Sequence, residues 1–241
     1  HEFVQHEERL TSPLIKENGT FREASWDEAL TLVTSKLRDI KEMHGPQAMG
    51  FLTSARTTNE ENYLVQKMAR AVVGTNNVDH CARLCHSSTV AGLATALGSG
   101  AMTNSMADVY ASANSILVIG SNTTEQHPVF GAKMRQAVLN RNVHLIVADP
   151  RRIELCDFAV MHIQQKPGTD IALINGLVNI ILEKGYEDRI FIDERTENFD
   201  VYAENIKLYP PNVVSEITGV PVAQLYRAVE IMVKNAPLAV F

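Results

Sequence analysis

The spacing of apolar residues along the chain predicts alternating helices and strands. A first helix follows Ser25, because apolar residues recur there every three or four positions up to the break at Gly45-Pro46. Short apolar runs predict strands at residues 48–53, 115–119, 143–148, 158–163 and 237–241. Further helices are expected at residues 59–74, 87–97, 128–139, 170–182, 187–195, 199–208 and 222–234, with a loop and short helix at 102–112.

This alternation predicts the fold class. Strands that alternate with helices, as they do here from residue 115 onward, are typical of βαβ units and a parallel sheet. The sequence therefore predicts an α/β fold with Rossmann-like parallel sheets flanked by helices. We expect two subdomains, a first α/β domain over residues 1–80 and a second Rossmann-like domain over residues 81–241. Because residues 1–3 include no initiator methionine and the last strand stops before its loop, we expect a fragment truncated at both ends.

Local signals predict where several elements begin. Asn18-Gly19 predicts a tight turn between two short extended pieces. Ser25 followed three residues later by Glu28 is the pattern of a capping box. Asn59 and Asp170 are expected to cap the helices that follow them.

Composition and charge narrow the possible functions. The chain has 241 residues, of which 45% are hydrophobic and 21% charged, enough for one large or two small domains. A net charge of -6 argues against a general nucleic-acid partner or an anionic membrane surface. No apolar run approaches the roughly 20 residues that a membrane span needs. Three cysteines argue against a disulfide framework and favour a reducing compartment.

Two of the cysteines lie in the segment 77–86, where each is next to a charged or imidazole side chain. Arg83 and His86 flank Cys85, and a helix start is expected just after it at residues 87–89. A nearby cation and a helix N-terminus both favour a thiolate, the form that attacks electrophiles and binds metals. The alternative is that Cys81 and Cys85 are small apolar fillers, as most free cysteines are. We expect Cys156, in an apolar and acidic context, to be a core residue.

Polar loops follow two of the predicted strands. Gly120 ends the strand 115–119 and is followed by a polar loop and a helix, the place where a Rossmann fold holds a nucleotide phosphate. Asp149-Pro150-Arg151-Arg152 ends the next strand; its carboxylate suits ribose hydroxyls and its arginines suit phosphates. The alternatives are an ordinary connecting loop at 120–127 and solvated or ion-paired arginines.

A self-contained metal site is poorly supported. The segment 79–86 lacks the second Cys or His pair that a structural zinc site needs. Three thiols are too few for the usual ligation of an iron–sulfur cluster. A metal that arrives on a sulfur-rich organic cofactor would need only one protein thiolate.

These motifs carry a resemblance to a known family. The cysteine segment, followed by Ala91-Gly92-Leu93, resembles the active-site segment of the catalytic (alpha) subunit of molybdenum- or tungsten-dependent formate dehydrogenases. The resemblance continues through residues 9–15, 24–29, 54–60, 120–122, 148–152 and 168–170. The elements at 26–29 and 149–151 recur through the molybdopterin oxidoreductase (DMSO reductase) superfamily, whereas Cys-Ala-Arg-x-Cys-His narrows the match to formate dehydrogenase.

The resemblance implies an activity and a cofactor. Formate would be oxidised to CO2, or CO2 reduced, at molybdenum or tungsten held by two molybdopterin guanine dinucleotides and by Cys85. His86 would help with proton handling or substrate orientation, and Asp170 would contact a guanine. The residues expected to bind the cofactor are Arg56, Gly120, Asn122, Glu125, Gln126, Asp149, Pro150, Arg151, Gly168 and Asp170.

The resemblance also implies partners outside this chain. A 4Fe-4S cluster would lie in a missing N-terminal domain, and a substrate-holding arginine beyond Phe241. Electrons would pass to iron–sulfur or diaphorase subunits of a larger complex, and we expect a cytoplasmic protein without nucleic-acid partners.

Other functions remain open. One alternative is another molybdopterin oxidoreductase, of nitrate or arsenite type, or a metal-free relative from a respiratory complex. The presence of both Cys85 and His86 argues against the metal-free version. A further alternative is a non-enzymatic α/β nucleotide-binding module.

Overall fold

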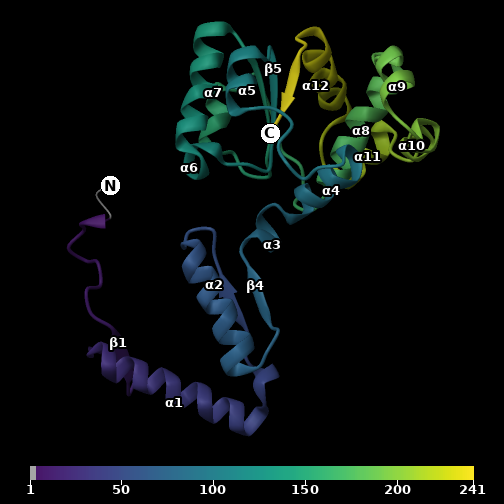
Figure 1. The fold of residues 1–241 in the computed structure, drawn as a ribbon. Coiled ribbons are helices and arrows are strands. Elements are labelled where there is room, and N and C mark those ends of the chain that lie inside the picture. The colour runs from purple at the N-terminus through teal and green to yellow at the C-terminus, as the bar shows by residue number, and fades with distance from the viewer. Residues whose placement is uncertain (1–3) are drawn as a thin grey trace. The chain divides into compact units, whose positions relative to one another are not determined.

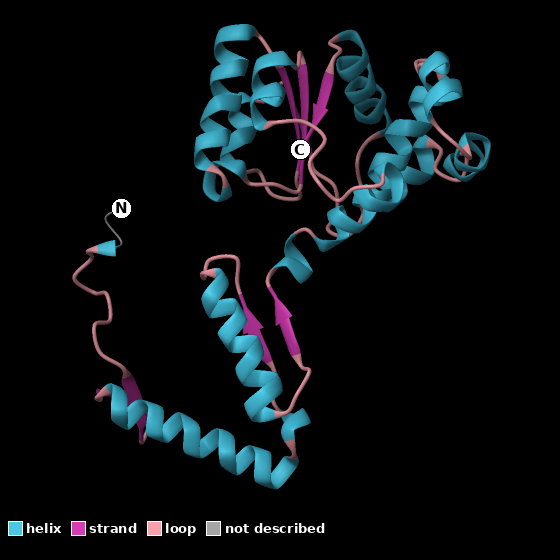
Figure 2. Cartoon of the chain, in the orientation of Figure 1, coloured by secondary structure: helices cyan, strands magenta, loops and turns pink. Residues whose placement is uncertain are grey.

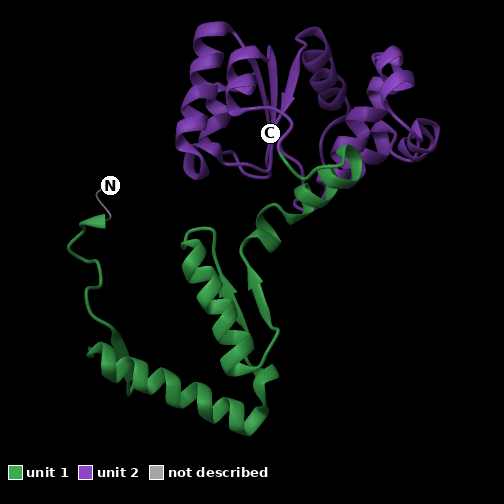
Figure 3. Ribbon diagram, in the orientation of Figure 1, with its two compact units in different colours: residues 1–101 green, residues 102–241 purple. Residues whose placement is uncertain are grey.

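The computed structural model describes residues 4–241 as two compact units, which divide after Ala101 (Figure 3). Residues 1–3, the start of the predicted lead-in, lie outside the described residues. Each unit combines a parallel sheet with helices (Figure 2), so the predicted α/β class is confirmed. None of the described helices is long and apolar enough to cross a membrane.

Unit 1 begins with a hairpin and a long helix. Asn18 and Gly19 take positive φ angles of 50° and 85° and turn β1 antiparallel onto β2, as predicted. Two short strands, β3 and β4, then pair in parallel. The elements are β1 Leu14–Glu17, β2 Thr20–Glu23, α1 Trp26–His44, a 3-10 turn Pro46–Ala48, β3 Phe51–Thr53, α2 Asn59–Lys67 continued by a π-helical turn Met68–Val73, β4 Val78–His80, α3 Ala82–Cys85 and α4 Ser87–Leu97.

Two helix starts in unit 1 differ from the sequence prediction. Ser25 caps α1 through the Glu28 N–H, but the Glu28 carboxylate accepts from Arg22 instead of completing a capping box. The complete capping box lies on α2, where Thr58 and Glu61 exchange hydrogen bonds, so the predicted cap at Asn59 is wrong by one residue. At α1 the charged Arg22 guanidinium is a stronger donor to Glu28 than the Ser25 N–H, and at α2 the Thr58 hydroxyl is better placed than the Asn59 side chain.

Unit 2 contains a four-stranded parallel sheet with the order β7-β6-β5-β8. Helices α6 and α11 were not predicted; the first lies inside the expected polar loop, and the second starts at a proline we interpreted as a break. The elements are α5 Met106–Ser112, β5 Ser115–Ile119, α6 Thr123–Gln126, α7 Pro128–Arg141, β6 His144–Ala148, a 3-10 turn Glu154–Phe158, β7 Met161–Ile163, α8 Asp170–Glu183, α9 Arg189–Arg195, α10 Phe199–Ile206, α11 Pro211–Thr218, α12 Val222–Lys234 and β8 Leu238–Val240.

Helices cover both faces of this sheet (Figure 1). Ile116 and Val118 of β5 pack with Phe130 and Met134 of α7 on one face. Leu117, between them in sequence, packs with residues of α8, α11 and α12 on the other face. Because both faces are covered, the strands are apolar throughout rather than alternating, which is why the pattern predicted them well.

The division between units does not coincide with the predicted boundary after residue 80. Residues 81–101 group with unit 1, because the Cys81 N–H donates to the Thr53 carbonyl at 3.1 Å and continues the β3–β4 pairing. Which of these parts forms each cofactor-binding domain stays a prediction.

The burial of the strands predicts that truncating two leucines of unit 2 will have very different effects on stability. Leu145 on β6 is fully buried, whereas Leu139 on α7 is 66% exposed. We expect Leu145→Ala to lower the free energy of unfolding by about 2–5 kcal/mol, and Leu139→Ala to change it by less than about 0.5 kcal/mol. Urea denaturation of both variants checks this, and equal losses would contradict the packing described here.

Candidate cofactor site

Three loops of unit 2 lie side by side at the carboxyl edge of its sheet. The Gly120 N–H donates to the Ala148 carbonyl, and the Asp149 N–H donates to Ile163, both at 3.0 Å. These bonds join the loop after β5 to that after β6, and the β6 loop to β7. The strand order reverses between β5 and β8, and ligands of open α/β sheets bind at the carboxyl edge beside such a switch point.

The loop after β5 combines an open backbone with buried polar side chains. Gly120 has a φ of 63°, and a β-carbon there would meet no atom within 4 Å. Asn122 is 8% exposed and Thr123 fully buried, yet Asn122 Oδ1 and Thr123 Oγ1 find no hydrogen-bond partner among the described residues. Glu125 and Gln126 lie exposed on α6. Two buried acceptors left unpaired at a sheet edge are unfavourable unless a ligand or water satisfies them.

The loop after β6 is shaped by its own aspartate. Asp149 is 6% exposed, and its Oδ1 accepts from the Arg151 N–H at 2.7 Å, which closes a tight turn through Pro150. The guanidinium of Arg151 is exposed and forms no ion pair with any described residue. Arg152 pairs with Asp157 on the surface, so the ion-paired alternative holds for that arginine. Arg151 is therefore the arginine of this loop that has no ion-pair partner among the described residues.

The loop after β7 contains a site residue that sequence reasoning missed. Asp170 does not cap α8; Thr169 is the N-cap residue and makes no side-chain capping bond, so that prediction is wrong. Instead Asp170 Oδ1 accepts from Gln165 Nε2 at 2.8 Å. Gln165 is 2% exposed. Its position two residues after the buried Ile163 was the available signal for a buried side chain, because side chains two residues apart along a strand share a face. Gly168 has a φ of 79° and turns the chain into α8.

The cysteine segment in unit 1 is exposed. Cys85 is the last residue of α3, and His86 is the N-cap residue of α4 without a side-chain capping bond. Cys81, Cys85 and His86 are all exposed, so the filler alternative is wrong for both cysteines. Cys156 is buried as predicted, and burial raises the pKa of its thiol.

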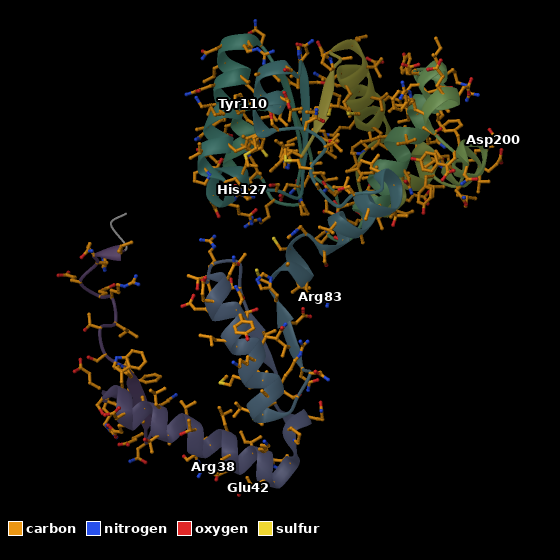
Figure 4. All side chains as sticks on the ribbon, viewed as in Figure 1. Arg38, Glu42, Arg83, Tyr110, His127 and Asp200 are labelled. Atoms are coloured by element: carbon orange, nitrogen blue, oxygen red, sulfur yellow. The ribbon has the colours of Figure 1, made fainter. Side chains whose placement is uncertain are left out.

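Hydrogen bonds tie the cysteine segment to the loop that carries Arg56. The Ala55 N–H donates to Cys81 Sγ at 3.2 Å, and the Arg56 N–H donates to Ser54 Oγ. Arg83, labelled beside α3 in Figure 4, donates through Nε to Asp79 Oδ2 at 2.9 Å. This bond lowers the pKa of Asp79. It also pairs the Arg83 guanidinium with Asp79, although that guanidinium was expected to stabilise the Cys85 thiolate. Of the predicted sources of support for the thiolate, the neighbouring His86 and the start of α4 remain.

The structure therefore brings the predicted residues together within each unit. In unit 2 the sheet edge gathers Gly120, Asn122, Glu125, Gln126, Asp149, Pro150, Arg151, Gly168 and Asp170. In unit 1, Arg56 lies in the loop bonded to the segment that carries Cys85 and His86. Among residues 4–241, no group of three or more His, Cys, Asp or Glu side chains is arranged to hold a metal ion.

Thiol accessibility gives a direct test of this arrangement. In the cofactor-free full-length subunit under native conditions, iodoacetamide should label Cys81 and Cys85 well before Cys156. Cys156 is buried, and its raised pKa leaves less thiolate at neutral pH. Mass spectrometry of timed digests gives the three rates within one sample. Labelling of Cys156 as fast as Cys85 would contradict the assigned burial.

Comparison with known proteins finds relatives named as formate dehydrogenase subunits. It is 45% identical over 220 residues to the F420-dependent formate dehydrogenase 1 subunit alpha of Methanococcus maripaludis, covering 91% of this chain and 32% of that protein. It is 44% identical over 220 residues to the F420-dependent formate dehydrogenase subunit alpha of Methanocaldococcus jannaschii, with the same coverage. The chain thus spans about a third of the length of these relatives.

A solved structure shares the fold. The acetylene hydratase of Pelobacter acetylenicus superposes with a TM-score of 0.71 at 25% identity, over 99% of this chain and 33% of that one. The molybdopterin oxidoreductase family matches residues 9–233, which is most of the chain. Together with the loops at the sheet edge and the exposed cysteine segment, this match shows that the chain belongs to the molybdopterin oxidoreductase family.

Proposed function

We propose that this chain is a central part of a formate dehydrogenase catalytic subunit, which oxidises formate to CO2 or catalyses the reverse reaction. The observation that carries the proposal is the exposed Cys85–His86 pair at the junction of α3 and α4. It lies in a chain whose similar relatives are named formate dehydrogenase alpha subunits. A thiol exposed at the start of an eleven-residue helix is suited to bind a soft metal centre.

The loops of unit 2 fit a guanine dinucleotide form of the molybdopterin cofactor. The unpaired Asn122 Oδ1 and Thr123 Oγ1 can accept hydrogen bonds from hydroxyl or amine groups of a ligand. Each such acceptor, if left unsatisfied, costs about 1–3 kcal/mol. Arg151 offers an exposed guanidinium to a phosphate, and the Asp170 carboxylate has lone pairs for the N–H groups of guanine.

The chain's own residues would have distinct parts in the reaction. Formate oxidation releases CO2, two electrons and one proton. Molybdenum or tungsten, held by two such cofactors and by Cys85, would supply the two-electron redox chemistry. His86 follows Cys85 directly and would orient formate or accept the proton, since an imidazole can carry or release a proton near neutral pH. Arg56 would contribute positive charge toward the cofactor.

The remaining parts of the proposal concern the whole protein. Because the chain spans about a third of its relatives, the 4Fe-4S cluster and the substrate-holding arginine would lie in other parts of the subunit. Electrons would leave through iron–sulfur or diaphorase subunits of a larger complex. The three free cysteines support a reducing compartment, and the cytoplasm is the proposed location.

A second candidate is another reaction of the same family. The solved relative that shares the fold is named for acetylene hydration, so this fold supports more than one reaction. This second candidate includes an enzyme that acts on nitrate or arsenite, and a family member without the metal. The family match favours either enzyme over a non-enzymatic nucleotide-binding module.

Replacing Cys85 tests the proposal. In the full-length subunit we expect Cys85→Ala to lower formate oxidation at least about a hundredfold, because the metal would lose its protein thiolate. Cys81→Ala is the matched control, since Cys81 is an exposed thiol of the same segment whose Sγ accepts from the Ala55 N–H and lies 3.8 Å from His80 Nδ1. It should keep the molybdenum or tungsten content and most of the activity.

The measurements are dye-coupled formate oxidation and metal content by mass spectrometry. Wild-type activity in Cys85→Ala would refute the ligand assignment. A wild-type subunit that holds the metal but acts on nitrate or arsenite, and not on formate, would favour the second candidate.

A further inference from the structure

Gln165 is nearly inaccessible and lies in the loop between β7 and α8. It is 2% exposed, and its Nε2 donates to Asp170 Oδ1 at 2.8 Å. Its Oε1 is also buried but has no hydrogen-bond partner among the described residues. The amide is therefore satisfied on one side only, and that side faces the carboxylate at the sheet edge.

This arrangement is unfavourable for folding alone. A buried amide oxygen without a partner costs free energy, whereas an apolar side chain of the same shape would avoid that cost. The loop backbone does not depend on the amide, because the Lys166 N–H donates to the Thr218 carbonyl at 2.9 Å and Thr169 Oγ1 donates to the Lys166 carbonyl at 2.7 Å. The burial of Gln165 is thus better explained by the hydrogen bond from its Nε2 to Asp170 than by a gain in folding stability.

No other hydrogen bond or ion pair with a described residue holds the Asp170 carboxylate. Asp170 is the first residue of α8, and it makes no capping bond to the helix backbone. Gln165 is the side chain that fixes the Asp170 carboxylate through one of its two oxygens. A carboxylate held at Oδ1 can still present Oδ2 and a second lone pair of Oδ1 to a ligand.

We propose that Gln165 is a positioning residue for base recognition: it orients the Asp170 carboxylate so that the loop selects guanine over adenine. This inference rests on the proposed function, in which Asp170 receives the guanine of the cofactor. Guanine presents two adjacent N–H donors, at N1 and N2, which pair with the two oxygens of a carboxylate. Adenine presents an acceptor at N1 beside its N6 donor, so an oriented carboxylate would face it with a repulsive oxygen. A freely rotating carboxylate would discriminate less.

The test uses nucleotide binding by the cofactor-free full-length subunit. GDP stands for the guanosine diphosphate part of the cofactor, and ADP is the competitor; calorimetry gives the ratio of their dissociation constants. We expect Gln165→Met to reduce the preference for GDP about tenfold, as the loss of a hydrogen bond to a charged group would. Its melting temperature should equal or exceed that of the wild type, because the unpaired Oε1 is removed.

A second variant and a matched control separate positioning from a structural role. Gln165→Glu keeps the shape but turns the donor into an acceptor facing Asp170, and it should reduce the preference for GDP at least as much. Asn179→Leu removes another half-buried amide of unit 2, on α8, whose Nδ2 donates to the Ile206 carbonyl of α10 at 3.0 Å. This control should keep the wild-type preference even where its stability falls.

Each outcome bears on one of two claims. If the wild type does not prefer GDP, or if Asp170→Asn leaves the preference unchanged, the guanine assignment of the proposed function fails and this inference fails with it. If Asp170→Asn loses the preference but Gln165→Met and Gln165→Glu keep it, only the positioning role of Gln165 is overturned. A parallel loss of GDP and ADP affinity with a lowered melting temperature would likewise assign Gln165 a structural role.

Discussion

The parallel pairing of β5 with β6 and of β6 with β7 is the constraint on which the candidate cofactor site depends. Its register places Ile119, Ala148 and Ile163 at one end of the sheet, so the loops after these residues must lie side by side. Backbone bonds extend this pairing by one residue into the β5 and β6 loops. Residues that are far apart in sequence therefore share one edge, which is where ligands of open α/β sheets bind.

Burial on both faces of the sheet fixes the position of this edge. The apolar clusters on its two faces leave the strands no freedom to shift register, because a one-residue slip would exchange the two faces. Against that frame the loops contain unpaired acceptors, an exposed guanidinium and a carboxylate held by a buried amide. Such an arrangement costs folding free energy and is typical of a site whose geometry serves binding.

The structure of the cysteine segment does not depend on the pairing of the unit 2 sheet. It is organised by short-range bonds: Arg83 with Asp79, Cys81 with the Ala55 N–H, and the helix start after His86. These contacts leave Cys85 exposed and without a cation bound to it. A thiol in this setting is available to an incoming metal, and its final electrostatic environment would be set largely by that metal.

Sequence alone determined the fold class and most helices and strands, because apolar periodicity is a local property. The role of the Cys85 thiol in binding a metal stays a prediction. Sequence reasoning misplaced the caps at Asn59 and Asp170 and missed α6, since the choice between competing hydroxyl, carboxylate and amide partners depends on distances that a linear pattern does not contain. Only the tertiary structure decided that Gln165 is buried against Asp170 and that Arg83 binds Asp79. The physical reason is that a side chain bonds to the partner whose distance and direction are most favourable. Those distances and directions follow from strand register and helix packing.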